Sequence, residues 1–159
     1  MPLPSLAAAL MLMIPPPVAG DDRTEILESV HSLVDAITSG DYEALDALLE
    51  SEGSVIAVDT LDPAERRQEV MTFTKLREPD GRDRPVFIER LGIPTVLQRG
   101  DIAHVWVPYR FSVSGTLRHC GINAFTLVRR DDRWRTAGIV YTVEATSTCA
   151  EVGAPETDG

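Results

Sequence analysis

Three long segments with strand periodicity follow one another in the C-terminal half of this sequence, separated only by short turns. Residues 102–113, 117–129 and 134–144 are rich in β-branched and aromatic side chains, and Ser114-Gly115 and Asp131-Asp132 lie between them. Two-residue turns join antiparallel neighbours, because a parallel connection needs a dozen or more residues. The sequence therefore predicts a continuous antiparallel meander.

The N-terminal half has helical periodicity instead. The expected elements are helices at 24–38 and 42–49, the second capped by Asp41, and strands at 54–60, 85–91 and 94–98. The run Asp62-Pro63-Ala64-Glu65 has the form of a capping box with proline at the first helical position. It predicts a third helix that turns Val70, Phe73 and Leu76 inward.

Helices that precede a run of strands are typical of an α+β fold, in which the helices cover one face of an antiparallel sheet. We expect one domain at residues 21–149 and a disordered polar tail at 150–159. Residues 1–20 carry a short apolar run and no acidic residue, which is typical of a signal peptide. The alternative is an apolar N-terminus that is buried or disordered.

A cleaved signal peptide predicts an exported protein, periplasmic or extracellular, with no membrane anchor after cleavage. The net charge of −10 makes nucleic acid and anionic membrane surfaces poor partners. The two cysteines, Cys120 and Cys149, predict a disulfide in an exported chain, and two unpaired buried thiols are the alternative.

No metal or other cofactor is expected. The side chains of His104 and His119 fall on neighbouring strands but about six residues apart along them, hence about 20 Å. Cysteines in a disulfide are not available as ligands.

The two turns also predict a strand register, in which Val113 pairs with Thr116 and Arg130 with Arg133. One sheet face is then nearly all apolar and should pack on the helices, while the other suits a ligand-lined concavity or a subunit interface. The first face holds Ala103, Val105, Val107, Tyr109, Phe111, Ile122, Ala124, Val128, Ala137, Ile139 and Tyr141; the second holds His104, Trp106, Arg110, His119, Asn123, Phe125, Trp134 and Glu144. A β-bulge would move these positions by one.

On the second face this register places Arg110, His119 and Glu144 side by side. Glu144 would orient His119 as a general base, and Arg110 would stabilise developing negative charge. A salt-bridge row at the sheet rim is the alternative. Asp59, at the end of the first strand, is a second candidate base, or is simply exposed there.

Six further residues are candidates for a pocket lining, each with a structural alternative such as core packing or a helix–sheet boundary. They are Trp106, Tyr109, Asn123, His104, Tyr42 and His31. Tyr109 belongs in this set only if a bulge turns it.

The sequence VHSLVDAITSGDYEALDALL, at residues 30–49, precedes the strand sequences HVWVPYRF, HCGINAFTLVRRDDRW and RTAGIVYTV. Together they resemble the nuclear transport factor 2-like superfamily, including SnoaL-like and lumazine-binding-type domains, over about residues 24–145. The resemblance implies a cone-shaped α+β barrel (a cystatin-like roll), a pocket between sheet and helices, and frequent dimers. Relatives include ketosteroid isomerase, scytalone dehydratase, limonene epoxide hydrolase and polyketide cyclases, which use pocket Asp, His, Tyr or Arg and no cofactor.

Three functions follow as hypotheses. The first is an exported domain that binds a small, partly apolar molecule. The second is a cofactor-independent isomerase, dehydratase or cyclase with His119 or Asp59 as base. The third is an interaction module that forms a homodimer through its polar sheet face. Fold alone does not choose between them, because function depends on the site.

Overall fold

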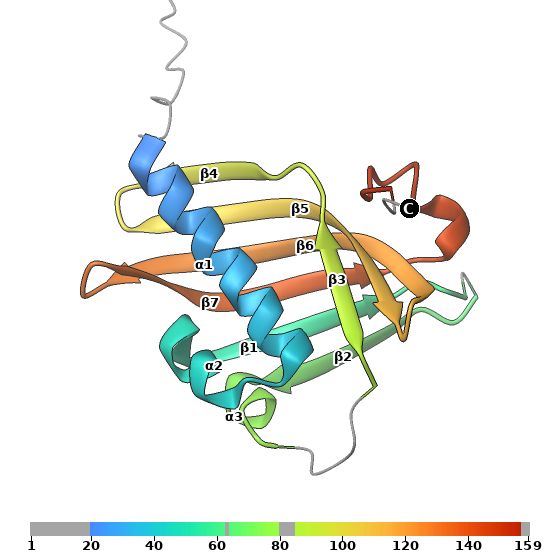
Figure 1. The fold of residues 1–159 in the computed structure, drawn as a ribbon, viewed down its shortest axis with the longest axis horizontal. Helices are drawn as coiled ribbons and strands as arrows, with labels where there is room; N and C mark the ends of the chain where they lie inside the picture. The colour runs from blue at the N-terminus through green and yellow to red at the C-terminus, as the bar shows by residue number, and fades with distance from the viewer. Residues whose placement is uncertain (1–19, 63, 80–84, 157–159) are drawn as a thin grey trace, which may run out of the picture.

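The computed structural model describes residues 20–62, 64–79 and 85–156, so nearly all of the expected signal peptide lies outside the described residues. The predicted α+β class is confirmed: α1 lies across one face of a curved, unclosed sheet (Figure 1). The helices are α1 (Gly20–Ser39), α2 (Tyr42–Leu48) and α3 (Phe73–Leu76), with a 3-10 turn at Thr146–Thr148. The strands are β1 (Leu49–Asp59), β2 (Arg67–Thr72), β3 (Phe87–Leu91), β4 (Thr95–Arg99), β5 (Ile102–Val113), β6 (Thr116–Arg130) and β7 (Arg133–Val143).

The strands form one sheet in the order β2-β1-β7-β6-β5-β3, and β4 also pairs with β5. The predicted meander is β5-β6-β7, joined by turns in which Ser114, Asp131 and Asp132 all have positive φ. β1 lies parallel to β7, so the sheet is mixed. That pair lies outside the meander, because β1 follows the helices directly and is far from β7 in sequence.

β3 and β4 pair with successive parts of the same edge of β5. Leu91 lies opposite Tyr109, and Thr95 lies opposite Trp106. At the corner between them the backbone N–H of Gly92 donates to the carbonyl of Pro108 at 2.7 Å. This bond holds the corner against β5, and Figure 1 shows β3 turned out of line with β4 on either side of it.

The core lies between α1 and the sheet. Ile26, Val30 and Leu33 from the predicted apolar stripe of α1 are buried in one cluster with Val105 and Leu127. Burial of this kind contributes about 25 cal/mol per Å² of apolar surface, so the stripe determines which face of α1 meets the sheet.

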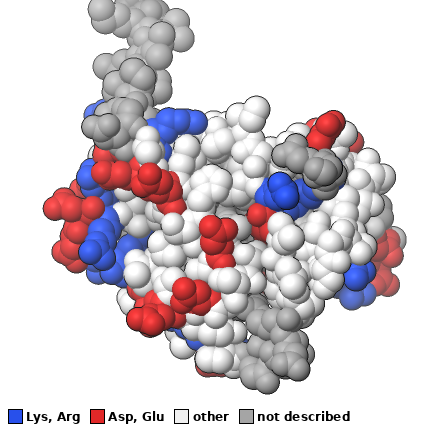
Figure 2. All heavy atoms as spheres, in the orientation of Figure 1, with Lys and Arg blue, Asp and Glu red and all other residues white. Residues whose placement is uncertain are grey.

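An ion pair and a hydrogen bond hold the first turn of α1 against the sheet. Asp22 pairs with Arg129 of β6 at 3.0 Å and accepts a hydrogen bond from the Gln98 amide of β4. Arg129 in turn lies over the Trp134 ring. Figure 2 shows acidic and basic side chains intermixed at this end of the face that α1 crosses. Among the described residues, no helix has the length and hydropathy to cross a membrane.

The predicted third helix is wrong over most of its length. Asp62 accepts a hydrogen bond from the Ala64 N–H, but only one turn forms there. Residues 67–72 are instead strand β2, which pairs with the edge of β1 and leaves Val70 68% exposed. Pairing with an open sheet edge supplies a ladder of hydrogen bonds that outweighs the local helix signal. Only Phe73–Leu76 is helical, and Phe73 is buried as expected.

The predicted register of the meander is also wrong beyond its turns. The pairing of Val113 with Thr116 holds, but a bulge then sets Phe111 opposite His119 and Arg110 opposite Cys120. A second irregularity between Thr126 and Leu127 sets Cys120 opposite Glu144. A slip of one residue exchanges the two faces of a strand. The two predicted face lists are therefore corrected in β6 and in the first part of β7, where Trp134 is buried in the core.

Cys120 and Cys149 form the predicted disulfide, with Cα atoms 5.5 Å apart. The 3-10 turn before Cys149 brings the chain back toward β6. We expected residues after Cys149 to be disordered, but 150–156 make turns in which the Ala154 N–H bonds the Cys149 carbonyl, and Ala154 is buried. The disulfide holds this polar segment against β6 through a small apolar cluster.

One glycine gives a direct test of the β6–β7 contact. A Cβ on Gly121 would collide with the Thr142 carbonyl, whereas a Cβ on Gly138 would meet nothing within 4 Å. We expect Gly121→Ala to lower the free energy of unfolding by about 1–3 kcal/mol, as overpacking does. Gly138→Ala is the matched control and should change it by less than about 0.5 kcal/mol. Urea denaturation measures both, and equal effects would contradict the register described here.

Candidate functional site

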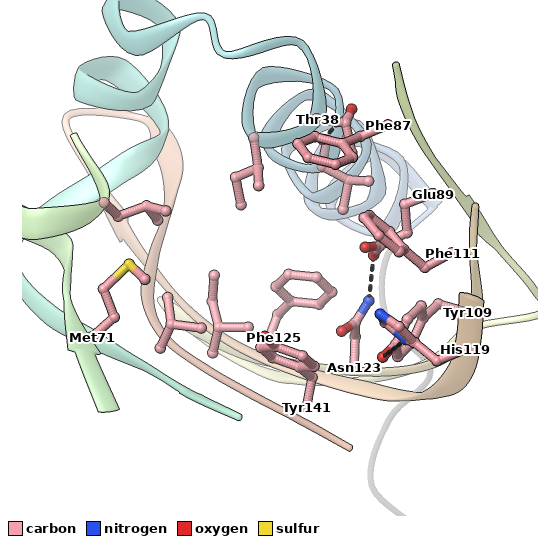
Figure 3. A pocket seen from close by; sticks show the side chains of 15 residues that line it. Thr38, Met71, Phe87, Glu89, Tyr109, Phe111, His119, Asn123, Phe125 and Tyr141 are labelled. Atoms are coloured by element: carbon pink, nitrogen blue, oxygen red, sulfur yellow. Dashed lines mark hydrogen bonds between the residues drawn. The ribbon is translucent and has the colours of Figure 1, made fainter. Parts of the chain in front are cut away.

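A cavity of about 280 Å³ opens between α1, α3 and the sheet. Most of its walls are aliphatic or aromatic. The lining side chains are Val34, Ile37, Thr38, Val55, Met71, Leu76, Phe87, Glu89, Tyr109, Phe111, His119, Asn123, Phe125, Ile139 and Tyr141. Figure 3 shows that Glu89, Asn123, His119 and Tyr109 gather at one end of it. The pocket is thus apolar with one polar end.

Glu89 is the acidic group at this polar end. It lies on β3 between Phe87 and Leu91, which share its face of the strand. Burial raises its pKa from 4.5 to about 7, although the hydrogen bond from the Asn123 amide to Oε1, at 2.7 Å, opposes this. A carboxyl with that pKa is present in both protonation states near neutral pH.

Tyr109 and His119 share a hydrogen bond whose direction follows from a third group. The Tyr109 hydroxyl lies 2.6 Å from the Thr142 carbonyl and 3.0 Å from Nδ1 of His119. A carbonyl only accepts, so the single hydroxyl proton goes to Thr142, and Nδ1 of His119 must donate to the hydroxyl oxygen. In neutral His119 this leaves Nε2 without a proton, as a hydrogen-bond acceptor.

The His119 ring is packed on both sides. It stacks on Phe111, with centroids 4.8 Å apart, and meets Tyr109 edge-on. Burial lowers the pKa of His119 below 6.5, and the charge of Asp59 acts in the opposite direction. Burial also raises the pKa of Tyr109 and of Tyr141, and the negative charge of Glu89 adds to both shifts. At neutral pH the imidazole and both phenols are therefore uncharged.

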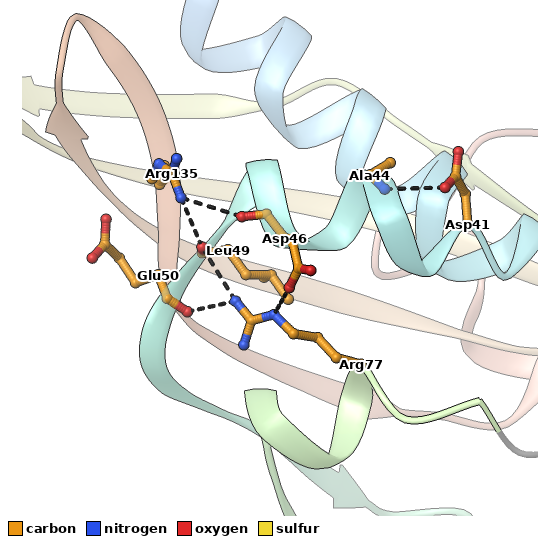
Figure 4. Close-up of polar contacts among 7 residues, drawn as sticks. All are labelled: Asp41, Ala44, Asp46, Leu49, Glu50, Arg77 and Arg135. Atoms are coloured by element: carbon orange, nitrogen blue, oxygen red, sulfur yellow. Dashed lines mark hydrogen bonds and ion pairs between the residues drawn. The ribbon is translucent and has the colours of Figure 1, made fainter.

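The α3 wall of the pocket is held by an arginine. Leu76 lines the cavity, and the next residue, Arg77, donates to the carbonyls of Leu49 and Glu50 where α2 passes directly into β1 (Figure 4). The Arg77 side chain also pairs with Asp46 at 2.7 Å. A cation at the end of a helix satisfies its last carbonyls and its dipole. Arg77 therefore fixes α3 against the end of α2.

The structure brings three of the sequence-predicted site residues together: His119, Tyr109 and Asn123 all line the pocket. Tyr109 and Asn123 are buried, and they come from β5 and β6. The bulge that the sequence left open as an alternative puts Asn123 and His119 on the same face as Tyr109.

The other predicted residues lie elsewhere. Arg110 falls in one row with Cys120 and Glu144 on the opposite face, so the row of Arg110, His119 and Glu144 does not form. Trp106 is 57% exposed on that face, and His104 lies there beside Thr126.

The remaining three predicted residues lie at the helices and at the end of β1. Asp59 accepts a hydrogen bond from the Leu61 N–H at the end of β1. It influences the pocket through the electrostatic effect of its charge on His119. Tyr42 packs on the core from α2, and His31 is exposed on α1.

Sequence reasoning missed Glu89. The signal was present in the strand Phe-Ile-Glu-Arg-Leu, where period-2 alternation puts the acid on the same face as two large apolar side chains. An acidic residue at a core-facing position of a strand is rarely buried without a function.

The same arrangement of helices and sheet occurs in solved structures. A cystatin-like protein of unknown function from Nostoc punctiforme has a TM-score of 0.63 at 12% identity, over 81% of this chain and 96% of that one. A nuclear transport factor 2-like protein from Cytophaga hutchinsonii has 0.62 at 17% identity, over 79% and 99%. One from Novosphingobium aromaticivorans has 0.60 at 23% identity, over 82% and 87%.

This chain has the nuclear transport factor 2-like fold. No family model matches the sequence, and no curated protein matches it. At these identities the likeness shows the fold, so the chemistry has to come from the pocket itself.

In this nuclear transport factor 2-like fold the polar end of the pocket holds two groups, Glu89 and His119, that can each donate a proton to a bound molecule or accept one from it. Within the described ranges, no three His, Cys, Asp or Glu side chains are grouped so that they could hold a metal ion.

The hydrogen bond between Tyr109 and His119 makes a prediction about the imidazole. ¹⁵N NMR of the ring should show the neutral form protonated at Nδ1, with a pKa below the 6.5 of a free imidazole. Tyr109→Phe removes the acceptor, so the proton should move in part to Nε2. Tyr141→Phe removes another pocket hydroxyl and is the control, with the tautomer unchanged. An Nε2-protonated ring in the unaltered protein would contradict the assigned direction.

Proposed function

We propose that this protein is an exported domain that binds a small, partly apolar molecule in the cavity between α1 and the sheet. The observation that carries the proposal is the cavity of about 280 Å³, with apolar walls and a single polar end at Glu89, Asn123 and His119. Ligand sites typically combine a mostly apolar lining with a few convergent polar groups that fix orientation.

Export is supported by two features. The disulfide between Cys120 and Cys149 is compatible with an oxidising compartment. The N-terminal segment has the composition of a signal peptide.

Filling the cavity should abolish binding of a small probe. Ile139 is buried in the lining, whereas the next residue, Val140, is 43% exposed on the opposite face. We expect 2-naphthol to bind the unaltered protein and Val140→Phe, and Ile139→Phe to weaken binding at least tenfold by occupying the cavity. Fluorescence titration measures the affinity, and thermal melting confirms that both variants fold. Equal affinity for both variants would place the probe outside the cavity.

The same polar end supports the alternative function of a cofactor-independent isomerase, dehydratase or cyclase. Glu89 and His119 take the acid–base roles there, because both line the pocket and Asp59 does not. Exchange of solvent deuterium into a bound enolisable ketone, lost in Glu89→Gln, would extend the proposal from binding to catalysis.

A second candidate function is homodimerisation through the outer sheet face. Register places one row of side chains across all the strands from β4 to β2: Thr95, Trp106, Ala124, Val140, Ile56 and Val70. The rows on either side hold Pro108, Ile122, Thr142, Val58 and Gln68, and Leu97, His104, Thr126, Gly138, Ser54 and Thr72.

Within these three described rows no side chain is an Asp, Glu, Lys or Arg. In a chain of net charge −10, such an uncharged face is where two copies can meet with little repulsion. A two-fold interface uses the same patch on both subunits, and these rows could form such a patch. The partner that fits is therefore a second copy of this chain.

Sedimentation velocity tests the dimer. We expect the unaltered protein to sediment as a dimer and Trp106→Glu to sediment as a monomer, because the substitution places two charges in the interface. Val86→Glu is the control, since Val86 is 64% exposed beside the Ser114 turn, at the other end of β5 from Trp106. A monomeric unaltered protein would rule out the dimer.

A further inference from the structure

We propose that the ligand of this pocket is a small protonated amine with an apolar body, its ammonium group held by Glu89 and the aromatic side chains around it. This inference rests on the proposed binding function and adds the charge of the molecule bound.

The first argument is the charge of the lining. Of the fifteen side chains that line the cavity, Glu89 is the one with a formal charge at neutral pH when ionised, and none is Lys or Arg. A buried carboxylate without a cation is costly, and here the cost is expressed as a pKa raised to about 7. A cationic ligand would supply the missing counter-charge.

The second argument is the negative electrostatic potential from carboxylates that lie outside the lining. The charges of Asp59 and Glu69 reach Tyr141, and that of Asp59 also reaches His119. Both are negative, as Glu89 is. The polar end of the pocket therefore favours a positive ligand and disfavours a carboxylate or a phosphate.

The third argument is hydrogen-bond polarity. Glu89 Oε1 already accepts from the Asn123 amide, and Nδ1 of His119 already donates to Tyr109. What these groups can still offer a ligand are three acceptors, Oε2 of Glu89, Oδ1 of Asn123 and Nε2 of His119, beside one donor, the second N–H of the Asn123 amide. Figure 3 shows these side chains converging at one end of the cavity. An ammonium group has three donors and no acceptor, which matches this set.

The fourth argument is the aromatic wall. Five aromatic side chains line the same cavity: Phe87, Tyr109, Phe111, Phe125 and Tyr141. Aromatic faces attract cations, and more strongly where water is excluded. The aliphatic side chains of α1 and β7, among them Ile37 and Ile139, would cover the apolar body.

Isothermal titration calorimetry with three probes of one shape tests the proposal. The probes are 2-phenylethylamine, 2-phenylethanol and phenylacetate, at pH 8.5, where Glu89 is ionised and a primary amine is still largely protonated. We expect the amine to bind at least tenfold more tightly than the alcohol, and phenylacetate to bind more weakly than either.

Glu89→Gln should remove the advantage of the amine over the alcohol and leave the affinity for the alcohol within about threefold. Glu28→Gln is the matched control, because it removes the same charge from an exposed position on α1. It should change the affinity for the amine much less. Equal loss of amine affinity in both variants would mean that net charge, rather than Glu89, attracts the amine, and would overturn the proposal.

The affinity for the amine should also rise by more than about tenfold from pH 5.5 to pH 8.5, as expected for a carboxyl of pKa about 7. The groups that share this end are His119 on β6, Tyr109 on β5 and Tyr141 on β7, with Thr38 facing from α1. Of these, His119 is the group that gains a positive charge when it is protonated, and that change would act in the same direction. An unchanged affinity across this range would contradict the proposal.

The outcomes separate the two proposals. Binding of 2-phenylethanol with no preference for the amine would overturn the amine and leave the binding function intact. Binding of none of the three probes, together with failure of 2-naphthol, would reject both.

Discussion

The bulge between β5 and β6 is the constraint on which the site depends. One extra residue on β6, between His119 and Leu117, changes which face of the sheet the rest of that strand presents. Without it, His119 and Asn123 would point toward solvent and Ile122 and Ala124 would fill the cavity. Because of it, the polar groups of β6 meet Tyr109 from β5 and Glu89 from β3 inside the cone.

The hydrogen bonds at this end of the sheet then fix one another. Gly121 lets the Thr142 carbonyl approach β6 closely, and that carbonyl accepts the hydrogen bond that the Tyr109 hydroxyl donates. The hydroxyl oxygen is left to accept from His119, so a backbone position in β7 determines the tautomer of an imidazole on β6. Because these groups are packed among Phe111 and Tyr141, leaving any one of the hydrogen bonds unmade would be costly.

The sequence predicted the elements with strong periodicity. The stripe of α1, the Asp41 cap of α2 and the bounds of β5 follow from local pattern and turn chemistry, and all three are confirmed. The segment 67–72 shows the limit, because its helix signal was local and its partner, β1, was not. For the site, the sequence pointed to His119, Tyr109 and Asn123, but it attached His119 to Arg110 and Glu144 and overlooked Glu89.

The sequence by itself determined the α+β class, the β5-β6-β7 meander and the disulfide between Cys120 and Cys149, because periodicity, turns and cysteine count are local or countable properties. Only the tertiary structure decided which side chains face the cavity and what their protonation is. The position of a bulge depends on the twist and packing of neighbouring strands, and the pKa of Glu89 depends on the surfaces that α1 and the sheet place around it. Neither the position of the bulge nor the pKa of Glu89 can be predicted from the few residues around it in the sequence.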